Sequence, residues 1–299
     1  MEQNTLEVTE QTEVFAFTSI RDLVNETLQK NYGQSDQTNG LLSGFRAFDK
    51  ATGGFQKGQL ITIAVKPGMG KTAFLLSLAN NMAIKNAYAV AIFSAERSNR
   101  KMTSRLIESE TGMSLAKLQR GALKPSEMDH LHSLVGGIAK ANLYFDDTPS
   151  LSVDDLVKKC RQLKLKHQID LIIIDYLELL TTHITDPDSR HEQLSHIVRR
   201  LHETANELNM PILLFSQTPS IFPSFGQTQR PGLKDLPVFL SELSDMVIFL
   251  HRGSLATANG FGKGKSVVEM VVAKHPDPAR QTVVPIDYIE SIAKFVDQS

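Results

Sequence analysis

Short continuous runs of apolar residues alternate with longer amphipathic segments along most of this chain. Apolar runs of about four to eight residues are typical of strands buried on both faces, and apolar residues at a spacing of three and four predict amphipathic helices. The predicted strands cover residues 60–65, 87–94, 142–145, 171–175, 212–216, 245–250, 266–273 and 282–286. The predicted helices cover residues 71–84, 101–111, 125–140, 153–167 and 189–209. This alternation predicts an α/β fold with a mainly parallel β-sheet flanked by helices.

The first 40 residues follow neither pattern for long. Residues 1–14 lack helical or strand periodicity, and we expect residues 1–18 to form a disordered acidic tail. Ser19 is placed to cap a short helix with a single apolar stripe. Because so short a helix is not stable alone, it must dock on its own domain or on a neighbouring subunit. We therefore expect a tail at 1–18, a linker helix and loop at 19–40, and one domain at 41–299.

Composition narrows the class of protein. The 299 residues are 41% hydrophobic and 22% charged, which is enough apolar material for a large core. The net charge of −1 argues against a polycation that coats nucleic acid. The single cysteine, Cys160, excludes an internal disulfide framework. The sequence has neither a membrane-length apolar stretch nor a secretory signal, so we expect a cytoplasmic protein without a membrane partner.

The segment between the first predicted strand and the first predicted helix has the composition of a phosphate-binding loop. Gly68 and Gly70 let the backbone wrap an anion, and the helix N-terminus adds positive potential. In such a loop Lys71 contacts the β- and γ-phosphates, and the Thr72 hydroxyl ligates Mg²⁺. Val65 stands at the position of the usual first glycine, and the alternative is a glycine turn that binds nothing. The candidate nucleotide-binding residues are Lys66, Pro67, Gly68, Met69, Gly70, Lys71 and Thr72.

Three polar residues follow other predicted strands and should share the sheet edge of this loop, because ligands bind at the carboxyl ends of parallel strands. Asp175 ends an aliphatic strand and is a candidate to hold Mg²⁺, although alone it would as readily cap a turn. Glu96 is a candidate to orient or deprotonate an attacking water. Gln217 is a candidate sensor of the γ-phosphate, or a strand-end residue bonded to backbone.

These motifs, in this order, resemble the RecA-like motor domain of DnaB-type replicative helicases over most of residues 41–299. The motifs are GGF at 53–55, KPGMGKT at 66–72, FSAE at 93–96, NLYFDD at 142–147, IDYL at 174–177, ELNMP at 207–211 and SQ at 216–217. The resemblance implies a RecA-like P-loop NTPase core that binds ATP and Mg²⁺ between the subunits of a homo-oligomeric ring. It further implies a hexamer that moves along single-stranded DNA, with loader or other replication proteins as partners.

The resemblance also implies roles for individual residues. Lys71 and Thr72 take the phosphates and Mg²⁺, Glu96 activates water, Asp175 serves the metal and Gln217 is the sensor. Arg105 matches an arginine of the family without a role that we can assign. The helix after Ser19 resembles the family's linker helix, which packs on the adjacent subunit. Since only 40 residues precede the motor domain, we expect the family's N-terminal helical domain to be absent.

Three departures from the family pattern remove cations. The family's trans-acting cations lie in a Lys-Gln-Arg run, whereas this chain has Lys274 but places Pro276 at the arginine-finger position. Arg280 is the candidate replacement. Because an arginine finger contributes about 10³–10⁵ in rate, turnover is expected to be weak. The family's DNA-contact loop reads DLRESG but is DLPVFL at 235–240, where we expect an apolar patch, and its SQLNR run is SQTPS at 216–220.

Three functions therefore stay open. The first is an ATP-dependent DNA helicase, a single-stranded-DNA-stimulated ATPase of DNA replication. Long loops at 219–237 and 253–265 are its candidate DNA contacts. The second is a degenerate relative that binds ATP and self-associates but serves as a scaffold, with the apolar segment 238–240 as a partner surface. The third is another RecA-like ATPase, such as a recombinase, although the IDYL and FSAE motifs favour the DnaB-like class.

Overall fold

A computed structural model describes Ile20 and residues 40–113, 117, 120, 123–183, 190–217, 230–252 and 264–298. The chain divides into two units, residues 1–37 and 38–299, and the strands and helices named below belong to the second. The predicted tail, almost all of the predicted linker helix, and most of the two long predicted loops lie outside the described residues. No helix among the described residues is long and apolar enough to span a membrane.

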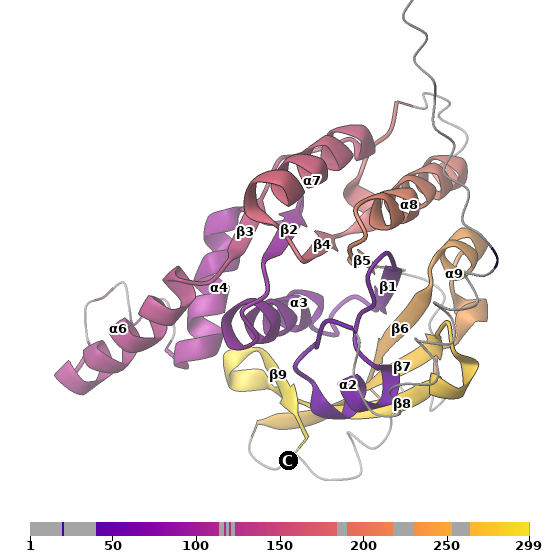
Figure 1. The fold of residues 1–299 in the computed structure, drawn as a ribbon. Helices are drawn as coiled ribbons and strands as arrows, with labels where there is room; N and C mark the ends of the chain where they lie inside the picture. The colour runs from indigo at the N-terminus through magenta and orange to yellow at the C-terminus, as the bar shows by residue number, and fades with distance from the viewer. Residues whose placement is uncertain are drawn as a thin grey trace, which may run out of the picture. The chain divides into compact units, whose positions relative to one another are not determined.

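Within the described residues, a nine-stranded sheet has the order β3-β2-β4-β5-β1-β6-β7-β8-β9 (Figure 1). The six strands β3, β2, β4, β5, β1 and β6 pair in parallel with their neighbours. The pairs β6–β7, β7–β8 and β8–β9 are antiparallel. The strands are β1 (Leu60–Val65), β2 (Val90–Ser94), β3 (Leu143–Asp146), β4 (Leu171–Asp175), β5 (Ile212–Ser216), β6 (Met246–His251), β7 (Lys265–Lys274), β8 (Thr282–Ile289) and β9 (Lys294–Asp297). Strands β1, β2, β4 and β5 are buried throughout, which explains their unbroken apolar sequences.

Helices cover both faces of the sheet, as Figure 1 shows. The helices are α2 (Arg46–Thr52), α3 (Lys71–Ala79), α4 (Asn99–Thr111), α6 (Pro125–Ala139), α7 (Val153–His167), α8 (Arg190–Glu207) and α9 (Val238–Leu243). One hydrophobic core lies between the sheet and helices α2, α3 and α4, and a second lies under α7, α8 and α9. Helix α6 packs on α4 and contributes no buried side chain. The predicted α/β class with a mainly parallel sheet is confirmed.

Each strand and helix predicted from residue 60 onward has a counterpart in the structure, with ends that differ by a few residues. Elements α2, α9 and β9 were not predicted. Helices α2 and α9 have seven and six residues, too few to display a helical period. The prediction of an apolar patch at 238–240 is wrong. Helix α9 buries Phe239 and Leu240, which are 6% and 1% exposed, and leaves Val238 at the surface.

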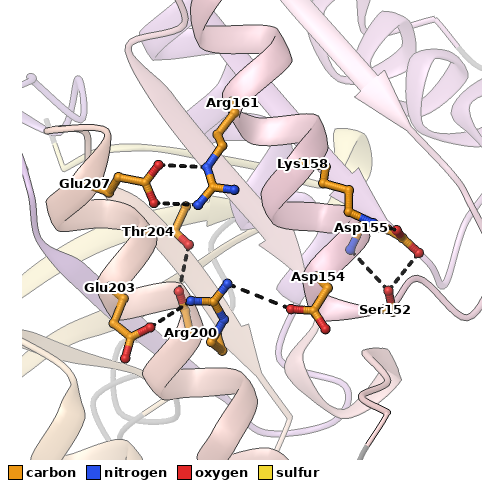
Figure 2. Close-up of polar contacts among 9 residues, drawn as sticks. All are labelled: Ser152, Asp154, Asp155, Lys158, Arg161, Arg200, Glu203, Thr204 and Glu207. Carbon is orange, nitrogen blue, oxygen red and sulfur yellow. Dashed lines mark hydrogen bonds and ion pairs between the residues drawn. The ribbon is translucent and has the colours of Figure 1, made fainter. Parts of the chain in front are cut away.

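Ion pairs join α7 to α8 on the outer side of the second core (Figure 2). The Arg161 guanidinium donates two parallel hydrogen bonds to the Glu207 carboxylate, at 2.7 and 2.8 Å. A second ion pair lies about two helical turns along both helices from the first. In it, Arg200 of α8 lies 3.8 Å from Asp154 of α7. Ser152 caps α7, since its Oγ accepts a hydrogen bond from the third backbone N–H that follows. The two helices are thus held to each other at the surface as well as through the core.

Candidate functional site

The phosphate-binding loop predicted after β1 has the backbone that such a loop requires. Gly68 and Gly70 have φ of 82° and 89°, in the left-handed region that favours glycine. A Cβ at Gly70 would also come within 3.2 Å of the Phe295 ring. Gly70 is the N-cap of α3, so the backbone N–H groups at the start of that helix face the loop. The turn therefore forms a concave, amide-lined end of a helix, which is suited to an anion.

Lys71 lies at the centre of the charged groups. Its Nζ is 2.6 Å from Asp175 Oδ1 and 2.7 Å from Glu96 Oε2, and it lies 3.5 Å from the centre of the Tyr176 ring. The Lys71 side chain is only 8% exposed. The two carboxylates and the aromatic face thus surround and stabilise a buried ammonium group.

The sheet explains why these groups meet. Strands β2 and β4 are parallel neighbours whose last residues, Ser94 and Asp175, are paired in register. The Ser94 hydroxyl donates to Asp175 Oδ2 at 3.3 Å. Glu96 follows two residues after Ser94, at the same edge where β1 runs into the phosphate-binding loop. The shared edge predicted from the sequence is therefore observed, although its use by a nucleotide stays a prediction.

Burial is the main influence on the pKa of Asp175. The residue is 1% exposed, and this desolvation raises the pKa of the carboxyl above its ordinary range, while the Lys71 ammonium acts in the opposite direction. A carboxylate at this depth depends on a cation beside it. If Lys71 turns toward a phosphate, another cation must take its place.

A cavity of about 600 Å³ opens beside the loop, within the size range of about 300–1,000 Å³ that is usual for small-molecule sites. It brings together predicted residues from three strand ends: Lys71 and Thr72 after β1, Glu96 after β2 and Gln217 after β5. The far wall comes from α4 and from the turn between β8 and β9. Lining residues that were not predicted include Arg97, Glu108, Tyr288, Glu290 and Ile292.

The residues present fit Mg²⁺ with a nucleotide. The Thr72 hydroxyl and the Asp175 carboxylate are both oxygen ligands, the kind that Mg²⁺ prefers. Both residues are buried, at 6% and 1% exposed. Mg²⁺ held by these two residues would place positive charge beside the buried Asp175 carboxylate. Among the described residues, no cluster of three or more histidine, cysteine or acidic side chains suggests a different metal site.

Glu178 was missed by the sequence reasoning, although it contacts the predicted sensor residue Gln217. It lies in the short 3₁₀ turn Leu177–Leu179 that follows β4. Its carboxylate accepts a hydrogen bond from Ser216 Oγ at 2.6 Å and from the Gln217 backbone N–H at 3.2 Å. The available signal was an acidic residue three positions after Asp175, in a turn that starts from the same edge.

The predicted trans-acting cations lie away from this cavity. Lys274 ends β7 opposite Val247, near the start of β6, and so lies at the other edge of the sheet. Its Nζ donates to two backbone carbonyls near the end of α9, at 2.9 and 3.1 Å. Arg280 lies in the turn between β7 and β8, 3.5 Å from Asp277 and close against Gly53. Neither side chain contacts the cavity of its own chain. That either residue acts on the nucleotide of a neighbouring subunit stays a prediction.

Comparison with known proteins gives one consistent result. Residues 40–297 match the family of the DnaB-like helicase C-terminal domain. The chain is 32% identical over 297 residues to the replicative DNA helicase DnaB of Geobacillus stearothermophilus, covering 98% of this chain and 64% of that protein. It is 30% identical over 301 residues to the replicative DNA helicase DnaC of Bacillus subtilis, covering 99% of this chain and 65% of that protein. The chain thus spans just under two thirds of the length of these relatives.

Solved structures agree with these relatives. The ATPase domain of G40P superposes with a TM-score of 0.82 at 28% identity, covering 95% of this chain and all of that domain. A DnaB-like replicative helicase, solved in a study of its interactions with primase, gives a TM-score of 0.81 at 28% identity, covering 95% of this chain and 68% of that one. The RecA-like fold predicted from the motifs is confirmed.

Proposed function

The chain belongs to the family of DnaB-like helicase C-terminal domains, and from this premise we propose that it is the ATP-hydrolysing motor of a replicative DNA helicase. The observation that carries the proposal is the meeting of Lys71, Glu96 and Asp175 beside an amide-lined helix end. A motor needs a phosphate clamp, a base for water and a metal-binding carboxylate at one place, and these three residue types meet that need.

The contacts suggest an order of events. The helix end and Lys71 bind the phosphates, so Lys71 leaves both carboxylates. Departure of Lys71 frees Glu96 Oε2 to accept a proton from the attacking water. Thr72 and Asp175 would hold Mg²⁺, which neutralises charge on the phosphates. Gln217, fixed through its backbone by Glu178, would report the presence of the γ-phosphate to the chain that follows β5.

We extend the proposal to the assembly. The chain would form a homo-oligomeric ring, expected to be a hexamer, that moves along single-stranded DNA in the cytoplasm, with loader, primase or other replication proteins as partners. Lys274 and Arg280 lie at the end of the sheet opposite the cavity, which is compatible with the proposed action of both residues on the nucleotide of a neighbouring subunit. In a head-to-tail ring, each subunit contacts the next through two different surfaces. A cavity on one surface and cations on another would suit that arrangement.

A second candidate function is a nucleotide-binding scaffold with little turnover. It is favoured by Pro276 at the arginine-finger position and by Lys274, whose three-donor ammonium is engaged by α9 carbonyls. The burial of Phe239 and Leu240 removes the apolar surface on which that scaffold was expected to bind a partner.

The test is ATP turnover with and without single-stranded DNA. We expect wild-type turnover to rise with DNA, and Lys71→Ala and Glu96→Gln to reduce it by about 100-fold or more. Glu96→Gln should still bind nucleotide, because the phosphate clamp is intact. Lys57→Ala, a change at an exposed lysine before β1, is the matched control and should leave turnover unchanged. Nucleotide binding with negligible, DNA-insensitive turnover would instead establish the scaffold.

A further inference from the structure

Arg97 occupies a position beside the proposed reaction centre that no motif assigned. After β2 ends, the four residues 95–98 lead directly into α4, whose N-cap is Ser98. This turn is fixed at its start, where the Ala95 N–H donates to the Asp175 carbonyl at 3.2 Å. Its end is fixed by the first hydrogen bond of α4, from Met102 to Ser98 at 3.0 Å. Glu96 and Arg97 are therefore adjacent side chains on a short, anchored turn.

The Arg97 guanidinium has at least one N–H donor without a hydrogen-bond acceptor among the described residues. It lines the same cavity as Gly68, Lys71 and Gln217. Its Nη2 lies 3.4 Å from Glu96 Oε1, and its side chain is 30% exposed. Within the described part of the chain, its buried Nε has no hydrogen-bond acceptor. A guanidinium has five N–H donors and no acceptor, so this environment suits a further anion.

The two oxygens of Glu96 face different cations. Oε2 contacts Lys71, which must leave when phosphate binds, whereas Oε1 faces Arg97. A bound nucleotide would thus free Oε2 for water and leave Arg97 beside Oε1. Arg97 then lies next to the base that activates water, on the cavity side where negative charge develops on the transferred phosphoryl group.

We propose that Arg97 is a catalytic residue that stabilises this charge from within the same chain, in the role that an arginine finger fills from a neighbour. The inference rests on the proposed ATPase function. In the step concerned, the water oxygen bonds to the γ-phosphorus and one water proton passes to Glu96. The bond from the γ-phosphorus to the bridging oxygen breaks with its electron pair on ADP, and inorganic phosphate forms. Arg97 donates hydrogen bonds to the oxygens of the transferred group and takes no proton.

The test separates the ground state from the transition state. ADP binding and ADP–aluminium fluoride binding, both with Mg²⁺, are measured by calorimetry alongside ATP turnover. We expect Arg97→Gln to bind ADP within about threefold of wild type, to lose most of the preference for aluminium fluoride, and to lose about 100-fold in kcat. Arg97→Lys keeps the positive charge, and its kcat should be about tenfold higher than that of Arg97→Gln. Arg100→Gln, at an exposed arginine in the first turn of α4, is the matched control.

Each other outcome is decisive. Unchanged kcat and unchanged aluminium fluoride preference in Arg97→Gln would overturn the proposal. Equal losses of ADP and aluminium fluoride binding would also overturn it, because Arg97 would then act on the ground state or on folding. If wild type binds nucleotide without turnover, the proposed function fails, and the aluminium fluoride preference alone still decides the role of Arg97.

Discussion

At the scale of single residues, the site is organised by what holds each polar group before a ligand arrives. Lys71 forms ion pairs with two carboxylates, at 2.6 and 2.7 Å, which it must leave if it is to contact a phosphate. The Glu178 carboxylate accepts a hydrogen bond from the backbone N–H of Gln217. The Glu178 contact limits the motion of the proposed sensor, and preorganisation of this kind lowers the cost of reaching a reactive geometry.

Glu178 gives a prediction at this scale. In Glu178→Gln one acceptor oxygen is replaced by an N–H₂ donor, which must then face the Ser216 hydroxyl or the Gln217 N–H. We expect ATP turnover to fall by about tenfold with little change in KM, since Gln217 loses its position while the phosphate clamp remains. Steady-state kinetics is the measurement, and Glu192→Gln at an exposed position of α8 is the control. A wild-type kcat would remove Glu178 from the mechanism.

Single residues also show where sequence reasoning stops. Glu96 and Asp175 each follow a buried strand of a parallel sheet, so the pattern of apolar runs is enough to place both at one edge. Glu178 and Arg97 could not be placed in this way, because each lies in a turn whose path depends on tertiary contacts rather than on periodicity. Lys274 and Arg280 lie in or next to a turn between antiparallel strands, and their edge of the sheet became clear only from the strand order.

At the scale of elements, buried strands and long amphipathic helices were predictable and short elements were not. The first four residues of β4 are aliphatic because both faces of the strand are covered, and the buried residues of α7 recur at helical spacing from Val153 to Cys160. Helix α9 has six residues, and its burial depends on docking under α8, a long-range contact that no local pattern encodes. The same contact turned a predicted surface patch into part of the core.

The α7–α8 ion pairs in Figure 2 give a prediction at the element scale. The Arg161 fork lowers the pKa of Glu207, so the pair stabilises the folded state above the ordinary glutamate range and loses this effect as pH falls through the lowered value. Arg161→Gln should therefore lower Tm by about 1–3 °C near pH 7, and the difference should shrink between about pH 5 and pH 3. Thermal melting followed by circular dichroism measures it.

The control for that pair is Lys158→Gln, which removes an ion pair with Asp155 inside α7 and leaves the two helices joined. Its effect on Tm should be smaller than that of Arg161→Gln. A difference between Arg161→Gln and wild type that stays constant down to pH 3 would mean that Arg161 acts through packing and not through the charge of Glu207.

At the scale of the whole molecule, the cavity and the predicted trans-acting cations lie at opposite ends of the parallel strands. The ends of β1, β2 and β5 line the cavity, and Asp175 at the end of β4 is buried beside it against Lys71. The other edge of the sheet carries Lys274 and Arg280, which have partners within their own chain. Subunits that place one edge against the other would bring these cations toward a neighbour's nucleotide. Because Arg97 lines the cavity, a single chain also has its own arginine beside the proposed reaction centre.

The central claim is that a nucleotide and Mg²⁺ bind together at the Lys71, Glu96 and Asp175 edge. The most direct measurement is calorimetric titration of ADP with and without Mg²⁺ into wild type and Asp175→Asn. We predict that Mg²⁺ strengthens ADP binding to wild type by about tenfold or more, and that Asp175→Asn loses this gain while it keeps metal-free binding. An equal Mg²⁺ effect in both proteins, or no ADP binding to wild type at all, would contradict the claim.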